Sequence, residues 1–167
     1  MTPRLEAVPG DITAEATDAV INAANPQLAR GAGVCGAIFA AAGPELDAAC
    51  AALGGAPTGD AKVTPGFGLR ARWIVHAVGP VWRGGDQGEP ELLASAYRRS
   101  LAVAAEIGAT SVAFPAISTG IYGYPLEPAT RIAVATCRAA PPEIELVRFV
   151  CFDEATFAAY ERAMAVN

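Results

Sequence analysis

"DAVINAANPQLARGAGVCGAIF", residues 18–39, changes its hydrophobic pattern halfway along, and this change decides the fold class. Residues 18–24 are a short run rich in Val, Ile and Ala, which is typical of a buried strand. Asn25 and Pro26 end the run, because proline lacks the N–H group that a strand ladder needs. "GAGVCGAIF", residues 31–39, then turns apolar in a way that indicates the start of a helix. The stretch therefore predicts a strand, a loop and a helix in succession.

The same succession recurs along the chain. Further Val- and Ile-rich runs, bounded by Gly, Pro, Asn or Asp, predict buried strands at 73–78, 110–117 and 146–152. Ala- and Leu-rich stretches with helical spacing predict helices around 34–53, 90–107, 127–138 and 154–165. Alternating strands and helices indicate an α/β fold with a mainly parallel central sheet, and ligands of such sheets usually bind beyond the carboxyl ends of the strands.

Length and composition favour one domain covering residues 1–167. A chain of 167 residues that is 53% hydrophobic can close one substantial core but is too short for two ordinary domains. No window reaches the roughly 18 consecutive apolar residues of a membrane-spanning helix. The N-terminal residues 1–11 lack a hydrophobic signal region, so we expect a cytoplasmic protein without a membrane partner. In the absence of an extended heptad or an apolar patch, we expect a monomer.

Cysteine spacing and net charge narrow the function classes. Four cysteines, Cys35, Cys50, Cys137 and Cys151, form no C-x-x-C pair, and His76 is the only histidine. This pattern predicts buried free thiols rather than a metal site or a disulfide framework. Twelve Lys and Arg against 17 Asp and Glu give a net charge of -5, which disfavours general nucleic-acid binding. An anionic ligand would have to be bound mostly by backbone N–H groups and helix ends.

Two glycine-containing loops could supply such N–H groups. Gly31, Gly33 and Gly36 precede or begin the first predicted helix, although they match neither the dinucleotide fingerprint nor the P-loop, and a plain packing turn is the alternative. "ISTGIYGY", residues 117–124, follows another predicted strand and adds hydroxyl groups and two tyrosine rings. Loops at two strand ends of one sheet could hold a diphosphate between them.

Asp11 is the third candidate, because it follows Gly10 in the turn "PGDITAEATDAV", residues 9–20. A carboxylate at this place can cap a turn or a helix. It can also accept a hydrogen bond from the exocyclic amino group of a base. The sequence leaves both roles open.

The motifs "GDI", "INAANP", "GAGVCGAI", "AVGPVW" and "FPAISTGIYGYP", in this order and spacing, resemble the macrodomain family and within it the bacterial MacroD-like class. The resemblance runs from about residue 5 to the C-terminus. It implies a three-layer α/β/α sandwich with a central mixed six-stranded sheet and a cleft for ADP-ribose across the strand ends. It implies neither a cofactor nor a metal.

The resemblance also implies ligand contacts. Asp11 would accept from the adenine amino group, the Ile12 N–H would donate to a ring nitrogen, and Phe152 would lie against adenine. Asn25 would bind the distal ribose, whereas Asn22 would hold the loop in place. The remaining implied ligand-binding residues are Ala23, Gly31, Ala32, Gly33, Val34 and Gly36, followed by Ser118, Thr119, Gly120, Ile121 and Tyr122.

Cys35 is the main departure from the family pattern. Members of the class remove ADP-ribose from acidic side chains and deacetylate O-acetyl-ADP-ribose. Their loop G-G-G-V-D-G-A-I-H contributes an aspartate that orients or deprotonates the water that attacks the distal ribose. Here Cys35 stands at that aspartate, Phe39 at the histidine and Ala32 at the middle glycine. A thiol with an ordinary pKa near 8.5 replaces a carboxylate poorly. Small-residue packing at the helix start is the expected role of Cys35, and a covalent Cys35 and His76 pair is disfavoured.

Two functions therefore compete. The first is an ADP-ribosyl hydrolase, with Asn25 and Cys35, at the usual aspartate position, as candidate catalytic residues. Its substrates would be ADP-ribosylated macromolecules or O-acetyl-ADP-ribose. The second is an ADP-ribose reader or scavenger without turnover. A nucleotide-binding scaffold of another kind would require that ADP-ribose does not bind at all.

Overall fold

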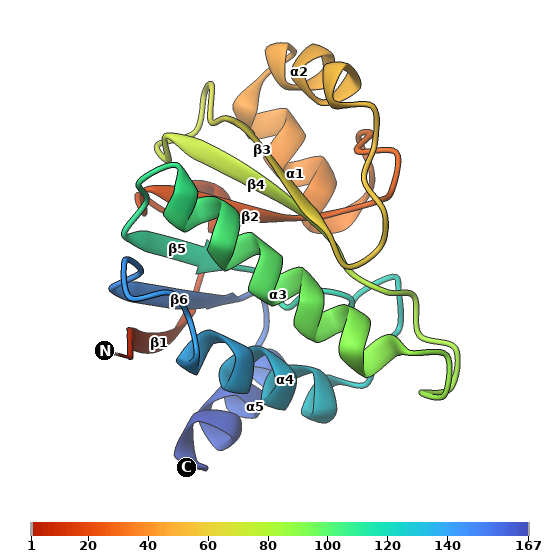
Figure 1. Cartoon of the computed structure of the whole chain (residues 1–167), viewed down its shortest axis with the longest axis vertical. Helices are drawn as coiled ribbons and strands as arrows, with labels where there is room; N and C mark the ends of the chain where they lie inside the picture. The colour runs from red at the N-terminus through yellow and green to blue at the C-terminus, as the bar shows by residue number, and fades with distance from the viewer. Residues whose placement is uncertain (1, 167) are drawn as a thin grey trace.

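A six-stranded sheet forms the middle of the molecule, as the computed structural model shows for residues 2–166 (Figure 1). The strand order is β1-β6-β5-β2-β4-β3, and every neighbouring pair is parallel except β3 with β4. The strands are β1 (Arg4–Pro9), β2 (Ala19–Ala24), β3 (Ala61–Pro65), β4 (Trp73–Val78), β5 (Ser111–Phe114) and β6 (Leu146–Cys151). The sheet is therefore mixed, with one antiparallel edge strand.

Helices cover both faces of the sheet and complete three layers. On one face α1 contacts β2 and α2 contacts β3, while on the other α3 crosses β4 and α5 lies along β1 and β6 (Figure 1). The α helices are α1 (Gly33–Ala42), α2 (Glu45–Leu53), α3 (Glu89–Glu106), α4 (Leu126–Arg138) and α5 (Glu154–Ala165). A short 3-10 helix, η1 (Ile12–Ala14), lies in the connection from β1 to β2.

The structure confirms the α/β prediction and corrects one helix. Residues 34–53 were expected to be one helix, but they form α1 and α2, which meet at an angle of 118°. Gly43 ends α1 with a φ of 98°, which L-residues rarely adopt, and Pro44 follows it. The Gly43 N–H still donates to the Phe39 carbonyl oxygen, but the positive φ of Gly43 turns the chain and Pro44 has no N–H to donate, so the first helix stops there.

Two clusters of buried side chains hold the layers together. The larger one joins the sheet to α3, α4 and α5, and it includes Phe149 on β6, whose ring stacks 4.5 Å from that of Tyr160 on α5. The smaller one joins the sheet to α1 and α2 through residues such as Ile38 and Ile74. Packing on both faces fixes the sheet, so the loops at its strand ends start from rigid positions.

The four cysteines are buried and free, as the sequence predicts.

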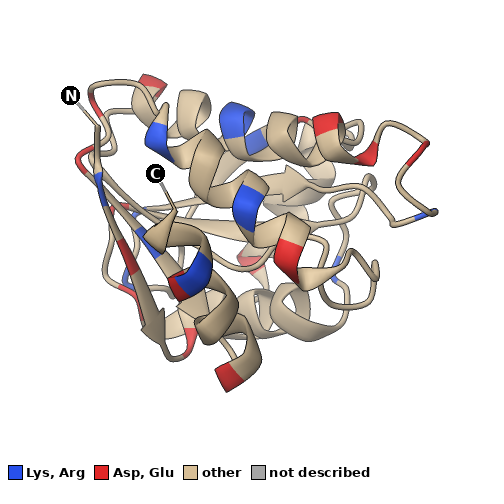
Figure 2. Ribbon diagram, turned by 90° about the horizontal axis from the view of Figure 1, so that it is seen from below, with Lys and Arg blue, Asp and Glu red and all other residues tan. Residues whose placement is uncertain are grey.

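In residues 2–166 no single helix is long and apolar enough to cross a membrane, and α1 with α2 passes that test only as a sharply bent pair. Figure 2 shows acidic and basic residues interspersed over the helices visible in that view.

Candidate functional site

A cleft with a volume of about 1270 Å³ lies where β2, β5 and β6 end. Among its lining residues are all but one of the predicted site residues: Asp11, Ile12, Ala23, Asn25, Gly31, Ala32, Gly33, Val34, Cys35, Ser118, Thr119, Gly120, Ile121, Tyr122 and Phe152. The structure thus brings together residues from four segments of the sequence: 11–12, 23–35, 118–122 and 152. This is the position at which an α/β sheet binds its ligand.

Gly36 is the predicted residue that does not line the cleft. A methyl group added at its Cα would lie 2.6 Å from the carbonyl oxygen of Gly31. Gly36 therefore allows α1 to pack closely against the loop before it, and its contribution to the cleft is indirect.

Asn25 fixes the shape of the first loop. Its Nδ2 donates to the Ala29 carbonyl oxygen at 2.9 Å, and its Oδ1 accepts from the Ala29 N–H at 3.0 Å. The loop leads to the N-terminus of α1, where the N-cap residue Ala32 has no side chain that could accept from the first-turn N–H groups. An uncapped helix N-terminus thus faces the cleft, and its free N–H groups and dipole favour an anion.

The second loop, residues 117–124, supplies further N–H groups. Tyr97 Oη accepts from the Ile117 N–H at 3.3 Å, and the Tyr124 N–H donates to the Ser118 carbonyl oxygen at 2.9 Å. Ser118 has a φ of 68°, which is unusual for a residue with a side chain. Among residues 2–166, the N–H groups of the loop tip 120–122 donate to no carbonyl oxygen. These N–H groups are therefore available to donate to a ligand in the cleft.

Gly79 allows this loop to lie close to the end of β4. A methyl group at its Cα would overlap Ser118 Oγ and Ile117 Cγ2. Gly79 lines the cleft but was not among the predicted residues, although it stands in the quoted motif "AVGPVW". A glycine directly after a buried strand was the available signal for this close approach.

A second contribution that the sequence analysis missed is the support behind the loop. The backbone N–H of Trp82 donates to the Tyr122 carbonyl oxygen at 2.8 Å. The centres of the Trp82 and Tyr124 rings are 4.7 Å apart. Glu89 organises the segment after Trp82, because its carboxylate accepts from the N–H groups of Arg83, Gly85 and Gln87. Burial alone would raise the pKa of Glu89, but these donors outweigh it and lower the pKa to about 2.

The charge of the cleft is unusual for an anion site. Within the described chain its lining contains no Lys, Arg or His, and its carboxylates are Asp11, Asp153 and Glu154. All three lie near Phe152, at the end of the cleft formed by β6 and the segment after β1. Any phosphate must therefore bind to backbone N–H groups elsewhere in the cleft, and the acidic end suits a group with hydrogen-bond donors.

Asp11 has the first of the two roles that the sequence left open, that of a cap, and its place in the cleft lining leaves the second role open. As N-cap of η1, its Oδ1 accepts from Thr13 Oγ1 at 2.7 Å and from the Thr13 N–H at 2.9 Å. These hydrogen bonds, led by that of the Thr13 side chain, lower the pKa of Asp11. The carboxylate is held in place by one oxygen, and it remains exposed at the cleft.

Cys35 lies at the opposite end of the cleft, beside Asn25 and Gly31. Its Sγ donates to the Ala29 carbonyl oxygen and accepts from Asn22 Nδ2, both at 3.7 Å. The thiol therefore has one donor and one acceptor as neighbours. Neither of these contacts is a base that could remove its proton.

Asn22 connects Cys35 to a buried polar group. Its Nδ2 lies 3.1 Å from His76 Nδ1, and His76 Nε2 lies 3.0 Å from Thr64 Oγ1. Burial lowers the pKa of His76 to about 4, so the ring is neutral at pH 7. In this network Nδ1 accepts and Nε2 donates. His76 is a core histidine with a polar partner at each ring nitrogen, and it does not contact Cys35.

The geometry suits an elongated ligand with an anionic middle. Backbone N–H groups from α1 and from the second loop would bind the anion, and Phe152, with 90% of its surface exposed, offers a ring at the acidic end. Asn25 and Cys35 lie at the other end, where the described lining residues include no carboxylate.

Comparisons with known proteins agree with this geometry. The family model described as Macro domain matches residues 21–133. A macro domain-containing protein of Ralstonia nicotianae is 53% identical over 98% of this chain and 95% of its own length. A Cronobacter sakazakii protein named O-acetyl-ADP-ribose deacetylase is 50% identical over 98% and 95% of the two chains. The solved Oceanobacillus iheyensis macrodomain with ADP superimposes with a TM-score of 0.92 at 40% identity, covering 98% of this chain and 91% of that one.

Proposed function

Because this chain belongs to the macrodomain family, we propose that it binds ADP-ribose in the cleft and hydrolyses O-acetyl-ADP-ribose or mono-ADP-ribosyl esters. One observation carries the binding proposal. Two sets of unpaired backbone N–H groups, at the uncapped start of α1 and at residues 120–122, face a single cleft that has no basic side chain. Such donors suit a diphosphate.

The two ends of the cleft give the ligand its direction. The adenine would lie at the acidic end, with its amino group donating to Asp11 and its face against Phe152. The Ile12 N–H would donate to a ring nitrogen. The distal ribose would then reach Asn25, Gly31 and Cys35, which lie beside one another.

Hydrolysis needs a water molecule that loses a proton as it attacks. At the ribose end the described lining offers the Cys35 thiol instead of a carboxylate, and the hydrogen bond of Sγ to the Ala29 carbonyl oxygen keeps its proton engaged. We therefore propose that a phosphate oxygen of the ligand itself accepts the proton that the attacking water loses. Losing a protein base commonly costs about 10²- to 10⁴-fold in rate, so turnover should be slow.

A reader that binds without turnover is the second candidate, and the absence of a carboxylate beside Asn25 in the described lining favours it. Both functions require the same binding. They differ in whether water can be activated at the ribose end.

A paired assay separates the candidates. ADP-ribose binding is measured by calorimetry, and release of acetate or ADP-ribose is measured with O-acetyl-ADP-ribose and with a mono-ADP-ribosylated protein. Wild type should bind at micromolar concentration and hydrolyse faster than the blank. Cys35→Asp should increase the rate, whereas Cys35→Ser, which adds no carboxylate, should not. If wild type binds ADP-ribose without releasing acetate or ADP-ribose from the substrates, the protein is a reader and not a hydrolase. If wild type does not bind ADP-ribose, both candidate functions are refuted.

A further inference from the structure

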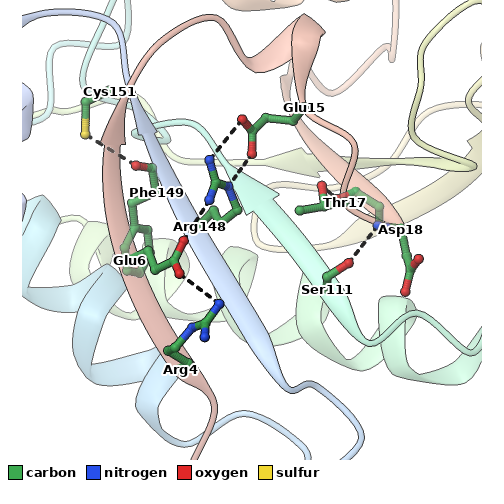
Figure 3. Close-up of polar contacts among 10 residues, drawn as sticks. Arg4, Glu6, Glu15, Thr17, Asp18, Ser111, Arg148, Phe149 and Cys151 are labelled. Carbon is green, nitrogen blue, oxygen red and sulfur yellow. Dashed lines mark hydrogen bonds and ion pairs between the residues drawn. The ribbon is translucent and has the colours of Figure 1, made fainter.

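Arg148 lies in the middle of β6 and forms a charged cluster with residues from two other segments (Figure 3). Its Nη1 donates to Glu6 Oε2 at 2.7 Å on the neighbouring strand β1. Its Nε donates to Glu15 Oε1 at 2.6 Å and its Nη2 to Glu15 Oε2 at 3.4 Å. Arg4 also pairs with Glu6, at 3.0 Å. The guanidinium therefore joins β1 and the β1–β2 connection to β6.

The position of Arg148 on the sheet explains why an ion pair occurs there. Arg148 is in register with Glu6 on one side and with Ala113 of β5 on the other, and Ala113 and Val150 belong to the core cluster on the α1 and α2 face. Helices α1 and α2 lie mainly over β2 and β3, and Arg148 is beyond the part of the sheet that they chiefly cover. The β1–β2 connection contacts Arg148 on this face instead, through Glu15.

That connection, segment 10–17, packs against α1 through η1, but it forms few hydrogen bonds to distant parts of the chain. The Gly10 N–H donates to the Cys151 carbonyl oxygen at its start, and Asp18 accepts from the Thr110 N–H just beyond its end. Ile12 is buried in the core cluster. Among residues 2–166, the hydrogen bonds from residues 11–17 to distant parts of the chain are those of Glu15 to Arg148.

Segment 10–17 carries Asp11 and Ile12, and β6 leads directly into Phe152. These three residues form the acidic end of the cleft. Both sides of that end are thus connected to β6, one through the chain itself and the other through Arg148 and Glu15. The Glu15 side chain is 15% exposed and that of Arg148 is 29% exposed, so solvent screens this pair less than the surface pairs of the helices.

We propose that Arg148 is a positioning residue for base recognition: through Glu15 it holds segment 10–17 so that Asp11 and Ile12 meet the base at a fixed distance from Phe152. Arg148 does not touch the ligand itself, because it is not part of the cleft lining. This inference rests on the proposed binding of ADP-ribose, and it concerns the base end rather than the chemistry at the ribose.

The two glutamates provide a matched pair of variants. Glu15→Gln removes one charge from the contact with segment 10–17, whereas Glu6→Gln removes the same charge from the contact with β1 and leaves the Arg148 link to Glu15 intact. Arg148→Met is a third variant, although it leaves two carboxylates without their partner. Arg98→Met, which breaks an exposed pair with Glu91 on α3, controls for the loss of a surface charge.

The first measurement is the preference for ADP-ribose over the analogue in which hypoxanthine replaces adenine. The analogue lacks the amino group from which Asp11 would accept a hydrogen bond. Because that hydrogen bond involves a charged group, wild type should prefer ADP-ribose over the analogue by about 10- to 100-fold. Glu15→Gln and Arg148→Met should reduce this preference about 10-fold, by weakening ADP-ribose binding alone. Glu6→Gln and Arg98→Met should retain it. Equal weakening of both ligands, or equal effects of the two glutamate variants, would overturn the proposal.

The second measurement needs no ligand. Amide hydrogen exchange of Thr13, Ala14 and Glu15, whose N–H groups are bonded within the segment, should accelerate in Glu15→Gln and not in Glu6→Gln. Exchange in residues 117–124 should stay unchanged. If wild type fails to bind ADP-ribose, the proposed function fails and base recognition with it, but the exchange result still decides whether Arg148 holds the segment. Unchanged exchange in Glu15→Gln refutes that role.

Discussion

Protonation of His76 offers a quantitative test of the buried network behind the cleft. His76 is the only histidine of the chain and is fully buried. Its Nδ1 accepts from Asn22 and therefore cannot carry a proton in the folded network. Burial lowers the pKa of the ring from an ordinary value of 6.5 to about 4. Acidification must either charge this ring or unfold the protein around it.

The sign and size follow from these two pKa values. Between pH 6.5 and about 4 the unfolded chain binds a proton that the folded chain does not, so the free energy of unfolding falls as the pH falls. Above pH 6.5 the contribution is fully retained. We expect a loss of about 2 kcal/mol between pH 7 and pH 5, and a limit of about 3 kcal/mol below pH 4. Carboxylates with a lowered pKa, such as Asp18, add their losses at lower pH.

Urea unfolding of wild type and His76→Gln at pH 7 and pH 5 measures this effect. The variant should lose less than about 0.5 kcal/mol over the same interval, and only the pH dependence is compared because its absolute stability also changes. An NMR titration of the single imidazole in wild type is the second measurement, and its midpoint should lie near pH 4. A midpoint above pH 6, or the same pH dependence in both proteins, would refute the reasoning.

Three further substitutions test the loops of the cleft. Cys35→Asp should accelerate release of ADP-ribose or acetate about 100-fold, within the range that one general base supplies, and an unchanged rate would contradict the assignment of the missing base. Gly79→Ala should weaken ADP-ribose binding by about 10-fold and lower Tm, because the added methyl group overlaps Ser118 and Ile117. Such overpacking costs about 1–3 kcal/mol. Calorimetry measures the binding, and thermal unfolding measures Tm. Glu89→Gln should lower Tm and weaken ADP-ribose binding through the loosened Trp82 support of Tyr122, whereas Glu91→Gln, at an exposed position of α3, should do neither.

The central strands and most helices were predictable because local runs and spacings of apolar residues indicate which segments are buried. Strand β4, for example, is apolar except for His76, and it is buried on both faces of the sheet. Strands β1 and β3 escaped the pattern analysis because they lie at the edges, where residues such as Glu6 and Lys62 interrupt the apolar run. Their presence was implied only by the resemblance to a family with six strands.

The loops of the site were predictable from glycines after strands, but their supports were not. Glu15 and Arg148 are 133 residues apart, and no local pattern indicates that they meet. The hydrogen bonds of Asn25 are a similar case, since its residue type fits a ligand contact as well as a loop contact. Roles of this kind depend on tertiary geometry that a single sequence does not display.

The uncapped start of α1 and the loop tip 120–122 have a consequence for how such proteins diversify. Every residue except proline carries a peptide N–H, so most side-chain replacements along these turns leave the donors in place. Affinity for an anion of this shape should therefore survive most substitutions, while the proposed hydrolysis depends on single side chains such as the one at position 35. If the proposed function holds, one substitution at that position would remove or restore turnover without ending ligand binding.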